Sequence, residues 1–170
     1  MEKDMENGPL NPLAHELLEM SQADQEMRTK AQKSTDEWDD SIDSRNTARL
    51  KEIVAEIGWP TISKVGPEAS QAAWLLVQHA YAKPEFMKQC LELMKQTPGD
   101  VRPTNVAFLE DRLLTMEDKP QIYGTQFRNI GDGWEPFPIE DPEYVDERRA
   151  SVGLGTLAEN EARIKAAYTN

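Results

Sequence analysis

Residues 50–60 read LKEIVAEIGWP and carry the clearest helical pattern of the chain. Apolar side chains recur in this segment at i, i+3, i+4 and i+7, from Leu50 to Ile57, and so form one stripe of an amphipathic helix. Gly58 and then Pro60 follow, in the order that typically ends a helix. The segment therefore predicts a helix that buries its apolar stripe against the rest of the fold.

Similar signals predict six more helices. Five segments have a proline at the first helical position, where the missing amide donor costs nothing, and in three of them a glutamate follows, near the positive end of the helix dipole. The last segment opens with Thr156 and Glu159, the spacing of a capping box. These six segments cover about residues 12–33, 67–82, 84–96, 103–116, 142–152 and 156 onward.

Residues 121–139 break the helical pattern. Four aromatic residues surround the sequence Gly131-Asp132-Gly133, which is the turn chemistry of a hairpin. We therefore expect an all-α fold of about seven helices, in an orthogonal bundle or a short helical array, with one small β-hairpin or ordered loop near residues 121–139. The polar residues 1–9 are predicted to be a flexible tail, and residues 10–170 a single helical domain.

The chain is strongly acidic, which limits its partners. Its 170 residues contain 19 Lys and Arg against 31 Asp and Glu, a formal charge of −12. This charge repels phosphate backbones and anionic lipids, so we expect neither a nucleic-acid partner nor a membrane partner. The single Cys90 excludes an internal disulfide, and the first residues, MEKD, do not open a signal peptide. We therefore expect a soluble protein of the reducing cytoplasm.

No pattern typical of a cofactor occurs. Two histidines and one cysteine are too few for a zinc site, and the chain has neither a glycine-rich phosphate loop nor a nucleophile elbow. Cys90 stands among apolar residues and is expected to act as a small apolar filler. We expect no metal and no cofactor.

An aspartate-rich segment, residues 36–43, leaves two interpretations open. Asp36, Asp39, Asp40 and Asp43 lie at i, i+3, i+4 and i+7, so on a helix they would share one face, as in sites that hold Mg²⁺ and a pyrophosphate. Aspartate is also common in caps and solvated loops. The segment then forms an acidic surface, with an N-cap at its last aspartate, that could dock a basic protein partner.

Several polar residues border apolar positions of the predicted helices. His79 lies on an apolar face and is either a core histidine or a general acid–base, because an imidazole exchanges protons near neutral pH. The adjacent residues Asp111-Arg112 border an apolar stripe and need a partner. Asp24 and Arg28 have the spacing of an ion pair, beside Gln25, and one edge of this group is expected to turn inward.

A short polar segment, QIYGTQ at residues 121–126, completes a set that resembles a known family. With Gly58-Trp59-Pro60, Gln78-His79, Asp111-Arg112 and the stretch from Arg148-Arg149 to Gly153-Leu154, it resembles a bacterial family catalogued as domain of unknown function 6624. The resemblance runs from about Asp24 to Leu157. It implies that the family keeps this polar set, and no established activity comes with it.

Two functions are compatible with these residues. The first is a metal-free pocket that binds a small anionic or polar molecule and, in its stronger form, transforms it by histidine acid–base chemistry. The second is a non-catalytic protein-interaction module, in which the polar residues form a structural hydrogen-bond network. For the first, the candidate catalytic residues are His79, Asp111 as its orienting partner, and Tyr123; the candidate ligand-binding residues are Gln25, Arg28, Gln78, Arg112, Gln121, Gln126 and Arg148.

Overall fold

The computed structural model describes residues 11–34 and 38–168 of the chain, which divides by its contacts into two compact units, Met1–Lys83 and Pro84–Asn170. The predicted tail, residues 1–9, and Asp36 of the acidic segment lie outside the described residues. None of the described helices combines the length and the apolarity that crossing a membrane requires.

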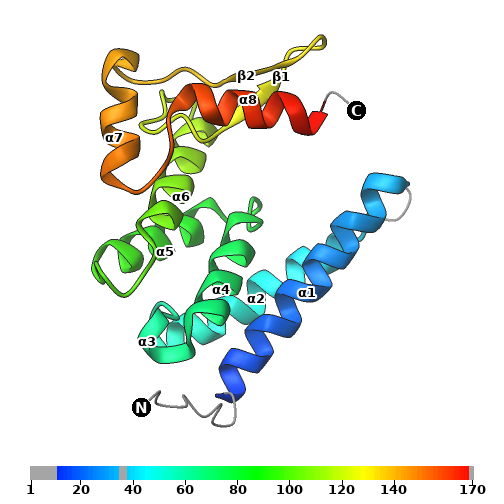
Figure 1. Ribbon diagram of the computed structural model, residues 1–170. Helices are drawn as coiled ribbons and strands as arrows, with labels where there is room; N and C mark the ends of the chain where they lie inside the picture. Colours follow the sequence, from blue (N-terminus) through cyan, green and yellow to red (C-terminus); the bar gives the residue numbers. More distant parts are fainter. Residues whose placement is uncertain (1–10, 35–37, 169–170) are drawn as a thin grey trace, which may run out of the picture. The chain divides into compact units, whose positions relative to one another are not determined.

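The N-terminal unit consists of helices only. Helices α1 and α2 run antiparallel, and α4 packs against both (Figure 1). Fully buried apolar side chains hold the three helices together, among them Leu17 of α1, Ile53 of α2 and Val77 of α4. The helices of this unit are α1 (Pro12–Lys33), α2 (Asp40–Ile57), α3 (Ile62–Val65) and α4 (Pro67–Gln78).

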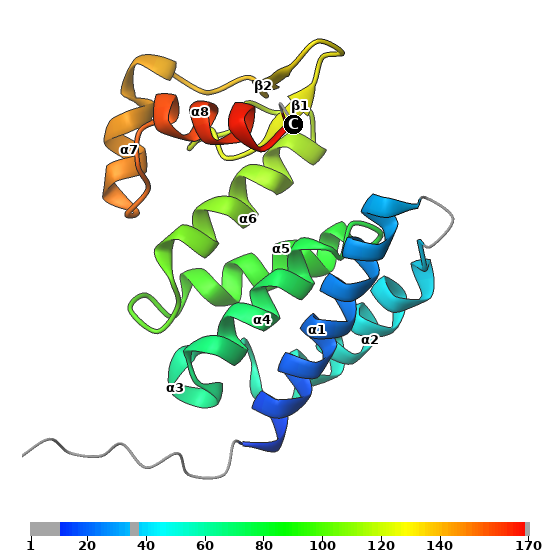
Figure 2. The same cartoon turned by 45° about the vertical axis from the view of Figure 1, so that its right-hand side comes forward.

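The C-terminal unit adds a hairpin to its helices. Helix α5 packs on α6, and α8 lies along the hairpin (Figure 2). Phe127 pairs with Pro136 and Asn129 with Trp134 in the antiparallel hairpin. The elements are α5 (Pro84–Lys95), α6 (Pro103–Met116), β1 (Phe127–Asn129), β2 (Trp134–Pro136), a 3₁₀ turn (Pro142–Tyr144), α7 (Val145–Ser151) and α8 (Leu157–Tyr168).

The structure confirms the predicted all-α class with one small hairpin. The described residues contain eight α-helices rather than seven, because α3 is a single turn, too short to show a periodic pattern. The predicted helix 142–152 is divided into a 3₁₀ turn, Pro142–Tyr144, and α7, Val145–Ser151. The capping box is present: Thr156 accepts from the amide of Glu159 at 3.2 Å, and Glu159 accepts from that of Thr156 at 2.8 Å.

Helix α4 ends four residues earlier than predicted. Its C-cap is His79, whose backbone (φ −97°, ψ 3°) leaves the helix, and the chain then turns through residues 80–83. The Lys83 amide donates to the carbonyl of Ala80, and Pro84 starts the next helix. This turn places His79 at the end of α4 rather than inside it.

The predicted role of Cys90 is confirmed. The side chain is fully buried in α5, and burial raises the pKa of its thiol to about 12. A thiol with such a pKa stays protonated at neutral pH and is a poor nucleophile.

Candidate functional site

A buried aspartate on α1 holds the histidine at the end of α4. Asp24 is 1% exposed, and its two carboxylate oxygens lie 2.9 and 3.0 Å from Nδ1 of His79. Gln25 donates a further hydrogen bond to Asp24 at 2.7 Å. Burial raises the pKa of Asp24, but the hydrogen bond and charge of His79, the bond from Gln25 and the charge of Arg28 outweigh burial, so this pKa lies below its ordinary value.

Arg28 connects this pair to helix α2. Its Nε lies 3.2 Å from Asp24 and its Nη2 donates to both oxygens of Asp43, at 2.8 and 3.0 Å. The guanidinium carbon also stands 5.0 Å from the ring centre of Trp38. Since two carboxylates already surround Arg28, its charge is compensated within the protein.

The aspartates of the acidic segment have separate roles. Asp39, not the expected Asp43, is the N-cap of α2 and accepts from the amide of Ser41 at 2.9 Å. Asp40 accepts from Nε1 of Trp38 at 2.5 Å. Burial raises the pKa of Asp43, and the charge of Arg28 only partly opposes it. Within residues 11–34 and 38–168, no group of three or more metal-ligating side chains forms a candidate metal site.

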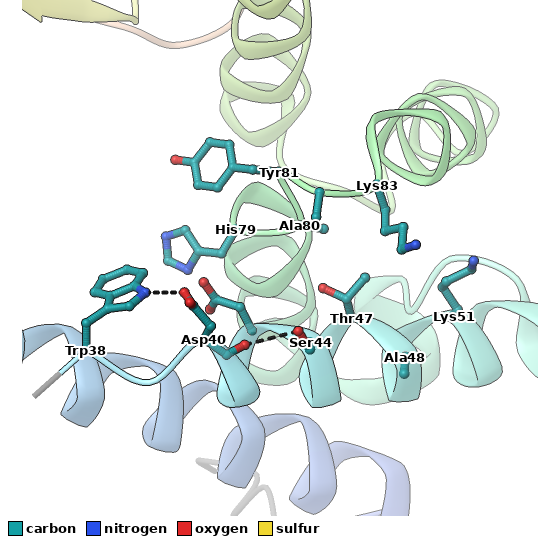
Figure 3. A pocket seen from close by; sticks show the side chains of 12 residues that line it. Trp38, Asp40, Ser44, Thr47, Ala48, Lys51, His79, Ala80, Tyr81 and Lys83 are labelled. Atoms are coloured by element: carbon teal, nitrogen blue, oxygen red, sulfur yellow. Dashed lines mark hydrogen bonds between the residues drawn. The ribbon is translucent and has the colours of Figure 1, made fainter.

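A pocket of about 490 Å³ opens beside His79 (Figure 3). The size is within the range of about 300–1,000 Å³ typical of small-molecule sites. His79 retains 16% side-chain exposure, and its ring stacks on Tyr81 with the centres 6.5 Å apart. The pocket is lined by Trp38, Asp40, Asp43, Ser44, Thr47, Ala48, Lys51, His79, Ala80, Tyr81, Ala82 and Lys83.

The hydrogen bond to Asp24 determines which ring nitrogen of His79 is available. In a neutral imidazole one nitrogen carries the proton and the other accepts. Nε of Arg28 also lies 3.1 Å from Nδ1, but its N–H points equally at the two oxygens of Asp24, at 3.2 and 3.3 Å. Since an ionised carboxylate only accepts, the shorter contacts of Asp24 with Nδ1, at 2.9 and 3.0 Å, assign the proton to Nδ1 and leave the lone pair on Nε2. Among the described residues, Nε2 has no hydrogen-bond partner. This is the arrangement of a general base whose orientation is fixed by a carboxylate.

The C-terminal unit contains a second buried aspartate, whose hydrogen-bond donors are mostly main-chain amides rather than ionisable side chains. Asp111 of α6 is fully buried, and its carboxylate accepts from the amides of Ile122, Tyr123 and Thr125 at 2.7, 3.0 and 3.0 Å. It also accepts from Oγ1 of Thr125 at 2.9 Å. The carboxylate therefore fixes the loop that precedes the hairpin.

Neighbouring polar side chains secure the same loop. The amide of Gln121 donates to the carbonyls of Gln126 and Phe137, both at 3.0 Å, and accepts from the backbone of Gln126 at 2.9 Å. Arg148 donates to the carbonyl of Ile122 at 2.8 Å, and Arg149 to that of Tyr123 at 2.7 Å. These side chains satisfy main-chain groups that the loop leaves unpaired.

Tyr123 combines a hydrogen-bonded backbone with a partly exposed side chain. Its backbone is held by Asp111 and Arg149, whereas the side chain is half-buried. Burial raises the pKa of the Tyr123 phenol, and the charges of Glu110 and Asp111 add to this shift. The phenol is therefore a proton donor at neutral pH rather than a base.

The predicted site residues fall into both units. Gln25, Arg28 and His79 come together around Asp24, with Gln78 buried next to His79 in the chain. The partner of His79 is Asp24 rather than the expected Asp111, whose oxygens accept from loop 122–125 instead. The C-terminal unit holds Asp111, Arg112, Gln121, Tyr123, Gln126 and Arg148.

Sequence reasoning did not single out Trp38, Lys51 or Lys83, which line the pocket. Isolated lysines and a tryptophan carry no pattern that distinguishes a pocket wall from ordinary surface. For Asp24 the sequence was partly informative, because its spacing from Arg28 predicted an ion pair, one edge of which was expected to face the core. The spacing gave no indication of His79, which is 55 residues away.

The fold and the site together define a mostly helical protein with a carboxylate-held histidine beside a pocket. A comparison with family models identifies the chain, over residues 11–170, as a member of the family of unknown function DUF6624. The chain belongs to this family, which confirms the resemblance carried by its motifs. Comparisons with curated proteins and with solved structures find no match.

Proposed function

We propose that the N-terminal unit binds a small polar or anionic molecule in the pocket beside His79 and exchanges a proton with it. The observation that carries the proposal is the environment of the His79 ring: Nδ1 faces the buried carboxylate of Asp24, and no group within residues 11–34 and 38–168 hydrogen-bonds to Nε2. A core histidine normally has both nitrogens satisfied by its neighbours.

The chemistry follows from this geometry. An O–H or N–H group of the ligand gives its proton to Nε2, and the resulting imidazolium is stabilised by the negative charge of Asp24. Asp24 is thus a positioning residue, and His79 is the proposed catalytic residue. The step needs no metal. The lone Cys90, buried and unreactive, supports a reducing, cytoplasmic setting.

The variant His79→Gln tests the proposal in a thermal-shift and turnover screen of phosphates, nucleotides and carboxylates. His79→Gln keeps a donor for Asp24 but removes proton exchange, so a ligand of the pocket should still bind while its turnover falls by about 10²-fold or more. The melting temperature should stay nearly unchanged. Collapse of the fold in this variant would show instead that His79 is structural.

Nitrogen NMR of the ring tests the proton placement directly. His15, an exposed histidine 3.5 Å from Glu19, serves as an internal control in the same spectrum. We expect neutral His79 to carry its proton on Nδ1 and to lose this preference in Asp24→Asn. A ring protonated at Nε2 in the unmodified protein would contradict the proposal, because that nitrogen could not accept a proton.

The alternative, a non-catalytic interaction module, is supported by the C-terminal unit. There Asp111, Gln121, Arg148 and Arg149 bind main-chain groups, as a structural network does. The proposed docking face at residues 36–43 predicts binding to a basic partner that weakens with salt. A variant without this face, Asp39→Asn/Asp40→Asn, should then lose the partner in a pull-down.

A further inference from the structure

We propose that the pocket beside His79 holds a small phosphomonoester, whose phosphate pairs with Lys51 and Lys83 while its organic part extends toward His79. This inference rests on the proposed function and names the class of its ligand. The two lysines line the same pocket as the histidine. They come from α2 and from the turn after α4, respectively.

The pocket is electrically asymmetric. Figure 3 shows Lys51 and Lys83 at one end, whereas His79, Trp38 and Asp40 lie at the other. An anionic group is attracted to the lysine end and repelled from the aspartate end, so its orientation is fixed before any specific contact forms. The net charge of −12 does not prevent this, because the local field decides where an anion binds.

The arginines expected to hold an anion are engaged elsewhere. Arg28 is bound to Asp24 and Asp43, and it does not line the pocket. Arg148 donates to the carbonyls of Ile122 and Asp141 in the other unit. Lys51 and Lys83 line the pocket with exposed side chains, and an ammonium group has three rotatable donors, so it can bind a phosphate oxygen beside another partner.

Two lysines match a dianion better than a single carboxylate. A phosphomonoester carries nearly two charges near neutral pH, because its second pKa is about 6. Two ammonium groups compensate this charge in full, and lysine is a common phosphate ligand as a point charge.

The middle of the pocket accommodates the organic part. Figure 3 shows Ser44, Thr47 and Ala80 between the two ends, and Ala48 and Ala82 are further small residues of the lining. Because these side chains are small, they leave room in the pocket for a ring or a short carbon chain. At the far end, Trp38 and Tyr81 provide aromatic surfaces on both sides of the histidine (Figure 3).

Four probes separate the phosphate from the organic part. Phenyl phosphate has both, inorganic phosphate has only the anion, and benzyl alcohol and benzylamine have a similar ring with no charge or a positive charge. We expect phenyl phosphate to shift the backbone amides of Lys51, Ala80 and Lys83 in NMR titrations, with a dissociation constant of about 1 mM or tighter, as ligands of this size reach. Inorganic phosphate should bind more weakly, and the two neutral or cationic probes should bind at least tenfold more weakly.

The double variant Lys51→Gln/Lys83→Gln is the decisive change. It should weaken phenyl phosphate binding at least tenfold, and salt raised from about 50 to about 500 mM should weaken binding to the unmodified protein, because screening acts on exposed charges. Lys30→Gln/Lys33→Gln changes the net charge equally on exposed residues of α1 outside this pocket, and it should leave the affinity unchanged.

The outcomes distinguish this inference from the proposed function. Absence of phenyl phosphate binding, equal binding of benzylamine, or an affinity indifferent to the two lysines would overturn the phosphate subsite, whatever the state of His79. A His79 ring protonated at Nε2, with phenyl phosphate still bound through the lysines, would overturn the proton transfer alone.

Discussion

Each unit of this protein buries one aspartate almost completely, but different groups compensate the two carboxylates. Asp111 accepts from three main-chain amides and a threonine hydroxyl, and all of these donors lie within one loop. Asp24 accepts from the side chains of His79, Gln25 and Arg28. Two of these donors, the imidazole and the guanidinium, are ionisable groups.

The two sets of donors differ in whether they can take up or release a proton. Main-chain donors do not change their protonation, and at Asp111 they hold loop 122–125 against the carboxylate. The imidazole at Asp24 has a second nitrogen, and a pocket lies beside it. A buried acid is therefore informative about function only through the identity of its donors.

The largest expected effect concerns the structural aspartate. Asp111→Ala leaves the amides of Ile122, Tyr123 and Thr125 without their acceptor. It should therefore lower the free energy of unfolding by about 3–5 kcal/mol, the usual cost of removing one member of a buried charged interaction. Urea unfolding measures this loss. Asp132→Ala in the exposed hairpin turn is the control and should change stability by less than about 0.5 kcal/mol. A loss as small for Asp111 would remove its structural role and with it the comparison.

The second effect tests how closely the Asp111 loop is packed. A Cβ atom at Gly124 would lie 2.9 Å from Cδ1 of Leu157 and 3.0 Å from Cδ1 of Ile139, and its φ is +66°. Gly124→Ala should therefore cost about 2 kcal/mol through overpacking and backbone strain. Gly99→Ala is matched to it, since φ is +86° and nothing lies within 4 Å of the added atom. Thermal unfolding should show a smaller loss for Gly99→Ala; equal losses would mean that the loop has room for a side chain.

The sequence was informative where local chemistry determines the structure. The helix predicted over residues 103–116 is α6, because Pro103 opens it and the apolar stripe continues to Met116. The hairpin was predictable from its glycine-rich turn and aromatic flanks. By contrast, residues 79–82 contain neither the glycine nor the proline that typically ends a helix, so the sequence pattern extended α4 beyond its true end at Gln78.

The site was less predictable than the fold, for a physical reason. An aspartate and an arginine four residues apart have the same spacing on an exposed helix face as in a core. Only the packing of α1 on α4 buries Asp24 and brings His79 to it. Asp111 was expected to pair with His79 because a buried carboxylate requires hydrogen-bond donors, but the amides of loop 122–125 are those donors.

The smallest expected effect lies within the Asp24 cluster, where two carboxylates around one arginine should respond to acid in opposite ways. The folded-state pKa of Asp24 is lower than its ordinary value of 3.8, so Asp24 stabilises the fold above that value and loses this contribution as the pH falls through its folded-state pKa. The folded-state pKa of Asp43 is raised, so its charge opposes folding near neutral pH, and stability is regained as the pH falls through that pKa.

Urea unfolding between about pH 7 and about pH 3 resolves the two contributions, each expected to be below about 1 to 2 kcal/mol after solvent screening. Asp24→Asn should flatten the loss of stability on the acid side, and Asp43→Asn should steepen it, because the variant lacks the compensating gain. Carboxyl ¹³C shifts during the same titration assign each change to its residue. If the pKa values of both aspartates lay on the same side of 3.8, the prediction would be wrong, because burial and the charge of Arg28 would then shift the two carboxylates in the same direction.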